Sequence, residues 1–130
     1  METLKPRESR LVHDVLARFG SRPDLMLWRN NVGASRTPAG RVIRFGTPGA
    51  ADILGAWRRV LTVHTVVNPY GFMPHEKIGP LIVGQAIAIE CKRAGEKQSE
   101  KQRRWQAAFE AAGGLYILAY HVDDVRDVLA

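Results

Sequence analysis

Residues 85–92 of this chain, QAIAIECK, give the clearest structural signal in the sequence. Their apolar side chains recur with a period of two, which predicts a β-strand. One face of the strand then carries Ile87, Ile89 and Cys91. The other face carries Ala86, Ala88, Glu90 and Lys92. We therefore expect one packed face and a second face on which a carboxylate and an ammonium lie about 6.5–7 Å apart, measured between Cβ atoms.

The segments around this strand alternate between helical and extended patterns. Helices are predicted over residues 6–19 and 99–112, and a short one that ends at Leu129 and is capped by Asp123 or Asp124. Strands are predicted over 24–28, 41–45, 52–55 and 115–119. In the helix over 99–112, Trp105, Ala108, Phe109 and Ala112 form the expected buried stripe. Such alternation predicts an α/β fold with a central mixed sheet flanked by helices.

Residues 57–83 are the least regular part of the chain. Two sets of side chains alternate here, so the strand that starts at Asp52 either continues or forms one arm of a hairpin around residues 68–71. One set is Val60, Thr62, His64 and Val66, and the other is Leu61, Val63, Thr65 and Val67. We interpret 57–83 as an insertion within one domain that spans residues 1–130.

The charge balance favours a polyanionic partner. The chain has 130 residues with 19 Lys plus Arg against 13 Asp plus Glu, a formal net charge of +6. Lys and Arg side chains release counterions when they bind a phosphate backbone, which favours binding. A single cysteine excludes an internal disulfide, and no apolar run is long enough for a membrane span. We expect a cytoplasmic protein with no membrane partner.

One carboxylate breaks the pattern of the first predicted helix. Glu8 lies on the same stripe as Leu11, Val12 and Val15, so it should point towards the core or a cleft. A carboxylate in such a place needs a partner or a metal.

Asp52 and Glu90 are candidates for a shared metal site. Asp52 stands at the head of a strand, and its carboxylate converges with that of Glu90 if the two strands pair. Carboxylate oxygens are the ligands that Mg²⁺ prefers, and Lys92 lies where it can orient a water or stabilise charge on a phosphate. Simpler interpretations remain open: turn chemistry for Asp52, and a solvent-exposed ion pair for Glu90 and Lys92.

The predicted helix over 99–112 adds two further features. Gln102 is either the capping-box partner of Ser99 or a residue of the catalytic site. A basic run follows Lys92 and is either a solvated helix face or a contact for a phosphate backbone. It consists of Lys97, Lys101, Arg103 and Arg104.

These residues together resemble a known family. The ordered set is Glu8, the segment 46–55 (GTPGAADILG), the segment 89–92 (IECK), the segment 99–102 (SEKQ) and the pair Gly113-Gly114. It is similar to the PD-(D/E)xK nuclease superfamily, and within it to the small stand-alone VRR-NUC proteins of phages and bacteria. The resemblance runs from Glu8 to about Asp124, and 28–33 (WRNNVG) looks like a loop of the phage members. The Pro-Asp pair is absent, because Ala51 precedes Asp52 and the proline stands at position 48.

The resemblance implies a restriction-endonuclease-like core (αβββαβ) and a metal-dependent endodeoxyribonuclease. Asp52, Glu90 and the backbone carbonyl of Cys91 would hold Mg²⁺ or Mn²⁺, and Lys92 would position the attacking water. Glu8 matches a first-helix glutamate of the metal region, and Gln102 matches a glutamine beside the site. The stand-alone relatives resemble Holliday-junction resolvases and act as homodimers on branched DNA.

Three other function classes compete with a nuclease. A non-catalytic DNA-binding or assembly module on the same fold would not need Asp52, Glu90 and Lys92 together. An RNase H-like carboxylate cluster would not need a lysine two residues after a strand carboxylate. A structural or antitoxin-like interaction protein would not need Glu8 on an apolar stripe. The residues therefore favour the nuclease.

Overall fold

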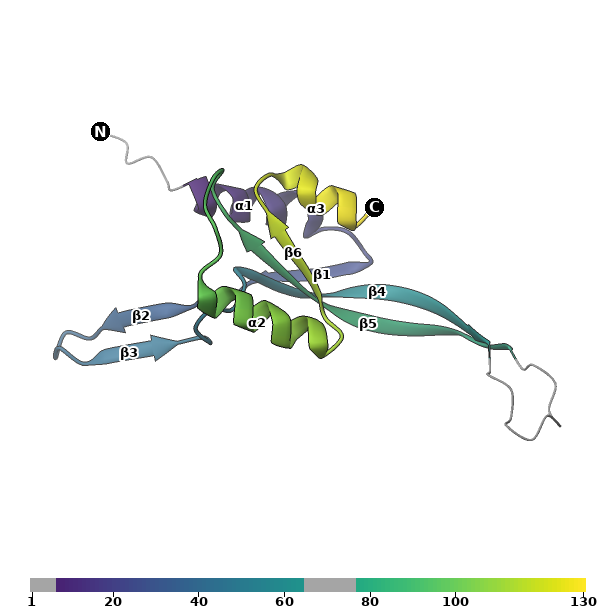
Figure 1. Cartoon of the computed structure of the whole chain (residues 1–130), viewed down its shortest axis with the longest axis horizontal. Coiled ribbons are helices and arrows are strands. Elements are labelled where there is room, and N and C mark those ends of the chain that lie inside the picture. Colours follow the sequence, from purple (N-terminus) through teal and green to yellow (C-terminus); the bar gives the residue numbers. More distant parts are fainter. Residues whose placement is uncertain (1–6, 65–76) are drawn as a thin grey trace.

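The computed structural model describes residues 7–64 and 77–130 (Figure 1). Its main sheet has four strands in the order β1 (Leu25–Arg29), β4 (Ile53–His64), β5 (Lys77–Cys91) and β6 (Leu115–Ala119). The pairs β1–β4 and β4–β5 are antiparallel, whereas β5–β6 is parallel. The predicted α/β fold with a mixed sheet and flanking helices is therefore confirmed.

The core lies on one face of this sheet, under α1 (Arg7–Phe19) and α3 (Val122–Val128). Ile87, Ile89 and Cys91 are fully buried there, as the strand pattern predicted. They pack against apolar side chains from both helices and the chain end that follows them: Val12, Val15, Phe19, Val125 and Leu129. Two separated helices thus cover the face that the alternation in β5 marks as packed.

The other face of the sheet carries α2 (Glu100–Ala111), and it is covered less completely. Trp105 stacks on Phe109 with ring centroids 4.9 Å apart and contacts Tyr116 of β6. These two α2 aromatics are only half-buried, and Ala108 and Ala112 are exposed. The predicted buried stripe of this helix is wrong in that respect, because α2 packs against β6 and no further layer of described residues covers it.

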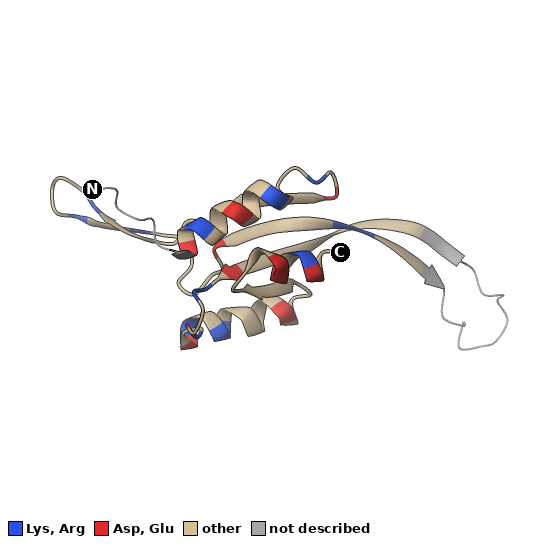
Figure 2. Cartoon of the chain, turned by 90° about the horizontal axis from the view of Figure 1, so that it is seen from above, with Lys and Arg blue, Asp and Glu red and all other residues tan. Residues whose placement is uncertain are grey.

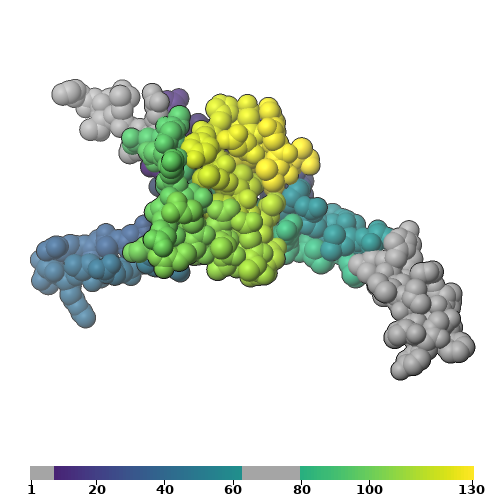
Figure 3. Space-filling model, viewed as in Figure 1, coloured from purple at the N-terminus to yellow at the C-terminus, as the bar shows by residue number. Residues whose placement is uncertain are grey.

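A separate two-stranded hairpin precedes β4. It pairs β2 (Gly33–Arg36) with β3 (Val42–Phe45) and is not part of the main sheet. The sequence predicts β3 but not β2, and the expectation that β3 belongs to the central sheet is wrong. Figure 1 and Figure 3 show the hairpin extending from the body at the end opposite to the outer part of β4 and β5.

Residues 57–64 and 77–83 continue β4 and β5 as one long hairpin. The predicted insertion is therefore, over its described part, the outer half of two sheet strands. The predicted turn at 68–71 lies outside the described residues. Several large apolar side chains of this outer half are exposed: Val60, Leu61, Leu81, Ile82 and Val83.

The start of α3 differs from the prediction, and the predicted start of the first helix cannot be compared with the described residues. The N-cap of α3 is His121, whose ring accepts a hydrogen bond from the amide of Asp123, so a cap by Asp123 or Asp124 is wrong. Asp124 instead supplies the reciprocal bond of the capping box, accepting from the amide of His121. The predicted start at Pro6 lies outside the described residues. Within the described chain, no helix combines the length and apolar character needed to cross a membrane.

Candidate active site

A pocket of about 440 Å³ lies at one end of the main sheet, between α1, the start of β4, the end of β5 and the first turn of α2. All five side chains that the sequence placed in a catalytic site line it: Glu8, Asp52, Glu90, Lys92 and Gln102. Four more residues complete the lining: Ser9, Val12, Arg29 and Glu96. The fold thus brings residues from the first helix and from the last third of the chain into one pocket.

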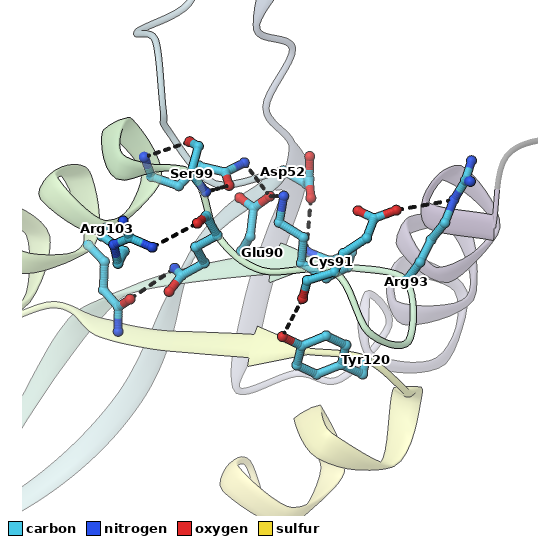
Figure 4. Close-up of polar contacts among 12 residues, drawn as sticks. Asp52, Glu90, Cys91, Arg93, Ser99, Arg103 and Tyr120 are labelled. Carbon is cyan, nitrogen blue, oxygen red and sulfur yellow. Dashed lines mark hydrogen bonds and ion pairs between the residues drawn. The ribbon is translucent and has the colours of Figure 1, made fainter.

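Asp52 reaches Glu90 because of the register of β4 and β5. Ile53 pairs with Ile89, so the residue before β4 lies beside the end of β5. One carboxylate oxygen of Asp52, Oδ2, accepts a hydrogen bond of 2.8 Å from the backbone amide of Cys91 (Figure 4). This bond fixes the Asp52 carboxylate next to the strand that carries Glu90.

The turn before Asp52 packs directly on α2. Gly49 has a φ of 84°, and a side chain there would collide with the backbone carbonyl of Lys101. Only glycine therefore allows both this backbone conformation and this close approach. Asn30 holds the other side of the turn, since its side-chain amide donates to the carbonyl of Ala51 at 3.0 Å and its backbone amide to that of Asp52 at 2.7 Å.

Glu90 is a buried carboxylate with one unsatisfied oxygen. Its residue surface is only 2% exposed. Oε1 accepts a hydrogen bond of 3.1 Å from Gln102 Nε2 and lies 3.9 Å from Lys92 Nζ, whereas Oε2 is buried without a hydrogen-bond partner among the described residues. Burial and then the Asp52 carboxylate raise the pKa of Glu90 to about 8, against the lowering effect of Lys92.

Lys92 is the cation that forms an ion pair with Glu90. Its side chain is 10% exposed and that of Glu90 is 3% exposed. A solvent-exposed ion pair, one of the simpler interpretations of Glu90 and Lys92, is therefore wrong. The ammonium lies inside the pocket, where its charge is screened less than on an open surface.

Gln102 forms the predicted capping box and also contacts Glu90. Its Oε1 accepts from the backbone amide of Ser99 at 2.8 Å, and the Ser99 hydroxyl accepts from the backbone amide of Gln102, which completes a capping box. Its Nε2 donates to Glu90. The same side chain thus begins α2 and orients a buried carboxylate.

Glu8 enters the pocket from α1, one helical turn before the buried Val12. Partial burial and the neighbouring Glu96 carboxylate raise the pKa of Glu8, while Lys92 lowers it. The apolar stripe predicted this inward position. We infer that Glu8 belongs to the acidic side of the pocket.

Three residues that line the pocket were not predicted from the sequence: Arg29, Glu96 and Ser9. Arg29 pairs with Ile53 and so lies next to Asp52, but only the register of β1 and β4 reveals this. Glu96 lies on the segment after β5, which is held by a hydrogen bond from the Tyr120 hydroxyl to the carbonyl of Glu96 at 2.9 Å. Ser9 follows Glu8 directly, so the inward position of Glu8 was the available signal.

Cys91 contributes to the site through its backbone alone. Its side chain lies in the core on the α1 side of the sheet, and burial raises the pKa of the thiol well above its usual range. Its amide binds Asp52, which places this peptide unit beside the carboxylate pair.

The predicted basic run lies outside the pocket. Its four members, Lys97, Lys101, Arg103 and Arg104, are all exposed. Arg103 donates to the carbonyl of Gln98 at 3.0 Å, and Arg104 forms an ion pair of 3.3 Å with Glu100. Lys101 and Arg104 line a shallow hollow with Pro48 and Trp105, next to the turn that leads to Asp52.

The residues present suit a hard divalent cation. Within residues 7–64 and 77–130, no three His, Cys, Asp or Glu side chains form a ready-made metal cluster. The site instead offers two adjoining carboxylates, one with an unsatisfied buried oxygen, and the strand carbonyl of the residue after Glu90. Mg²⁺ commonly takes one or two carboxylates and keeps several waters, so this donor set fits it.

Comparison of the chain with protein-family models, with curated proteins and with solved structures found no match.

Proposed function

We propose that this protein is a metal-dependent, structure-selective DNA endonuclease with a restriction-endonuclease-like core of the VRR-NUC type. The order of the sheet and its helices supports this core. Apart from the β2–β3 hairpin and the final helix α3, the elements run α1, β1, β4, β5, α2, β6 along the chain, which is the arrangement αβββαβ. Asp52 at the head of β4 and Glu90 near the end of β5 then occupy adjoining ends of two paired strands.

The buried, unsatisfied Oε2 of Glu90 carries the proposal. An unpaired carboxylate oxygen in the protein interior costs free energy that a merely structural residue would not need to bear. Burial and the adjacent Asp52 carboxylate both disfavour a negative charge on Glu90 when no cation is bound, as the raised pKa of Glu90 reflects. A divalent cation would satisfy both carboxylates at once.

Each polar residue of the pocket has a role in phosphodiester hydrolysis. Asp52, Glu90 and the Cys91 carbonyl would hold Mg²⁺ or Mn²⁺, which lowers the pKa of a bound water and polarises a phosphate oxygen. Lys92 positions the attacking water and stabilises negative charge as it develops on the phosphate. Gln102 holds the Glu90 carboxylate in place, and Glu8 extends the acidic side of the pocket.

The proposed substrate is branched DNA such as a Holliday junction, and the proposed assembly is a homodimer. One chain has one such pocket among its described residues, so two symmetric cuts need two chains. The exposed apolar pair Val60 and Ile82, which lies on one face of the outer half of β4 and β5, supports self-association, since exposed apolar surface commonly marks an interface.

Cleavage of labelled DNA tests the proposal. The panel comprises a four-way junction, a flap, a duplex and a single strand, each with Mg²⁺, with Mn²⁺ and with EDTA. We expect Asp52→Asn to reduce cleavage to background and Lys92→Ala to slow it by about a hundred- to a thousandfold. Asp14→Asn is the matched control, because Asp14 lies exposed on α1 outside the pocket.

Cleavage that persists in EDTA, or that survives Asp52→Asn, would overturn the proposal. A protein that binds DNA but cuts none of the four substrates with either metal would support the non-catalytic module instead. A readout without catalysis separates the two: Mn²⁺ should raise the melting temperature of the wild type and not that of Asp52→Asn.

A further inference from the structure

The β2–β3 hairpin is a two-stranded ribbon that leaves the body of the protein. All eight of its strand residues are exposed, although three of them are the large apolar residues Val42, Ile43 and Phe45. Figure 3 shows that the hairpin stands away from the sheet and helices along most of its length. A ribbon of this kind contributes little to the core, so its exposed surface calls for another explanation.

The hairpin carries positive charge only. It has three arginines, Arg36, Arg41 and Arg44, and no Asp or Glu occurs anywhere from residue 25 to residue 51. None of the three forms an ion pair with a described carboxylate. Figure 2 shows blue and no red along this hairpin, in contrast to the mixed colours of the three helices.

The register places two of the arginines on one face of the ribbon. Arg36 pairs with Val42 and Arg44 pairs with Ala34, and these alternate with the pairs Ser35–Ile43 and Gly33–Phe45. Directly paired residues share a face, so Arg36 and Arg44 lie diagonally on one face, about 7–8 Å apart at the backbone. The opposite face carries Ile43 and Phe45. We call the first the arginine face and the second the apolar face.

The root of the hairpin is tied to the catalytic pocket. Asn30, three residues before β2, is bonded to the carbonyls of Ala51 and Asp52. Arg29, just before it, lines the pocket. The segment after β3 leads through Gly49, against α2, to Asp52 within seven residues. The chain segments that enter and leave the hairpin are therefore both held beside the proposed catalytic residues.

We propose that the arginine face of the β2–β3 hairpin binds the phosphate backbone of duplex DNA next to the scissile position. This inference rests on the proposed nuclease function and names the part of the chain that holds the duplex. Arginine presents a planar fork of donors that suits phosphate oxygens. A two-stranded ribbon also fits into the major groove of B-form DNA, and backbone contacts of this kind position a protein without reading sequence.

Salt-dependent binding tests the role of the hairpin independently of cleavage. The affinity of the full chain for a labelled duplex and for a four-way junction is measured by fluorescence anisotropy in EDTA, from 50 to 200 mM salt. For the double variant Arg36→Gln/Arg44→Gln we expect the slope of log affinity against log salt to fall in magnitude by about 2, because each removed arginine leaves one phosphate with its counterions. Affinity at the lowest salt should fall on the order of tenfold.

The control removes the same charge elsewhere. Arg58→Gln/Arg126→Gln also takes away two arginines, one on β4 and one on α3, both exposed and outside the pocket. We expect it to change the salt slope by less than about 0.5, since these sites are not proposed to touch phosphate. A salt slope that is unchanged in Arg36→Gln/Arg44→Gln, or equally changed in the control, would overturn the proposal.

A second copy of the chain is the rival occupant of the hairpin. If Ile43→Ser/Phe45→Ser dissociates a dimer in sedimentation while the arginine variant leaves the salt slope unchanged, the ribbon is a protein interface and the proposal is wrong. The nuclease proposal and the proposed hairpin contact can be disproved independently of each other. A wild type that cuts no DNA but shows the expected slopes overturns the nuclease alone, whereas normal cleavage with unchanged slopes overturns the hairpin contact alone.

Discussion

The β4–β5 hairpin has two halves that differ in environment although both are rich in apolar residues. In the inner half, Ile53, Ile87 and Ile89 are fully buried beneath α1 and α3. In the outer half, Val60 pairs with Ile82 and Leu61 with Leu81, and all four are exposed. The difference shows that alternation marks a strand, but only the helices that cover the strand make its apolar face a core.

Removing one isoleucine from each half should give the largest contrast. We expect Ile89→Ala to lower the free energy of unfolding by about 2–5 kcal/mol, because it leaves a cavity in a fully packed core. Ile82→Ala, at a site that is 62% exposed, should cost less than about 0.5 kcal/mol. Urea denaturation measures both, and equal destabilisation would show that the two halves are packed alike.

The inner half also holds a buried ionisable group, Glu90. Because its pKa is raised from 4.5 to about 8, the native state keeps a proton that the unfolded chain has released over this range. Stability in EDTA should therefore fall as the pH rises from about 5 to 8, because only the unfolded chain releases this proton readily over that range. Glu90→Gln should remove most of this dependence, which urea denaturation at a series of pH values measures.

The control for the pH experiment is Glu110→Gln, because Glu110 is exposed near the end of α2. This variant should keep the fall in stability between pH 5 and 8. Parallel curves for the wild type and Glu90→Gln would show that Glu90 does not hold a proton in the folded protein.

Two glycines of the same hairpin give a smaller contrast. A side chain at Gly55 would collide with the backbone carbonyl of Met26 and the side chain of Leu27, so Gly55→Ala should destabilise the fold by about 1–3 kcal/mol. At Gly84 the nearest atom to a new Cβ is 3.9 Å away. Gly84→Ala should therefore be neutral or stabilise the strand by up to about 1 kcal/mol. Thermal unfolding of the two variants at one pH measures the difference.

The smallest effect on stability is expected for substitutions at Val60 and Ile82, the exposed pair in the outer half of the β4–β5 hairpin. Val60→Thr/Ile82→Thr should change the free energy of unfolding by no more than about 0.5 kcal/mol. The same variant should weaken self-association if these side chains lie at the proposed dimer interface, and sedimentation velocity over a range of concentrations measures this. An unchanged sedimentation coefficient would place the interface elsewhere.

Local patterns predicted the elements that are amphipathic in themselves. The alternation in 85–92 assigned Ile87, Ile89 and Cys91 to the core face, and the stripe of α1 placed Glu8 inward. The capping box of Ser99 and Gln102 could be predicted because these two residues are only three positions apart. Each of these signals depends on neighbours within one or two turns.

The remaining features depend on contacts that no local pattern contains. Strand β2, with the sequence GASR, has no apolar alternation and exists because it pairs with β3. Arg29 and Glu96 reach the pocket through strand register and through a hydrogen bond from Tyr120. The partly exposed stripe of α2 has a helical period like that of a buried one, and the absence of a covering layer among the described residues decides its environment.

The capping box of α2 and the bond to Glu90 together restrict residue 102 to an amide. A glutamate there could still accept the hydrogen bond from the Ser99 amide, yet it would replace the donor to Glu90 with a second carboxylate. An alanine would remove both bonds. Helix initiation and the orientation of the buried carboxylate are therefore one structural requirement, so α2 cannot fray at its start without releasing Glu90.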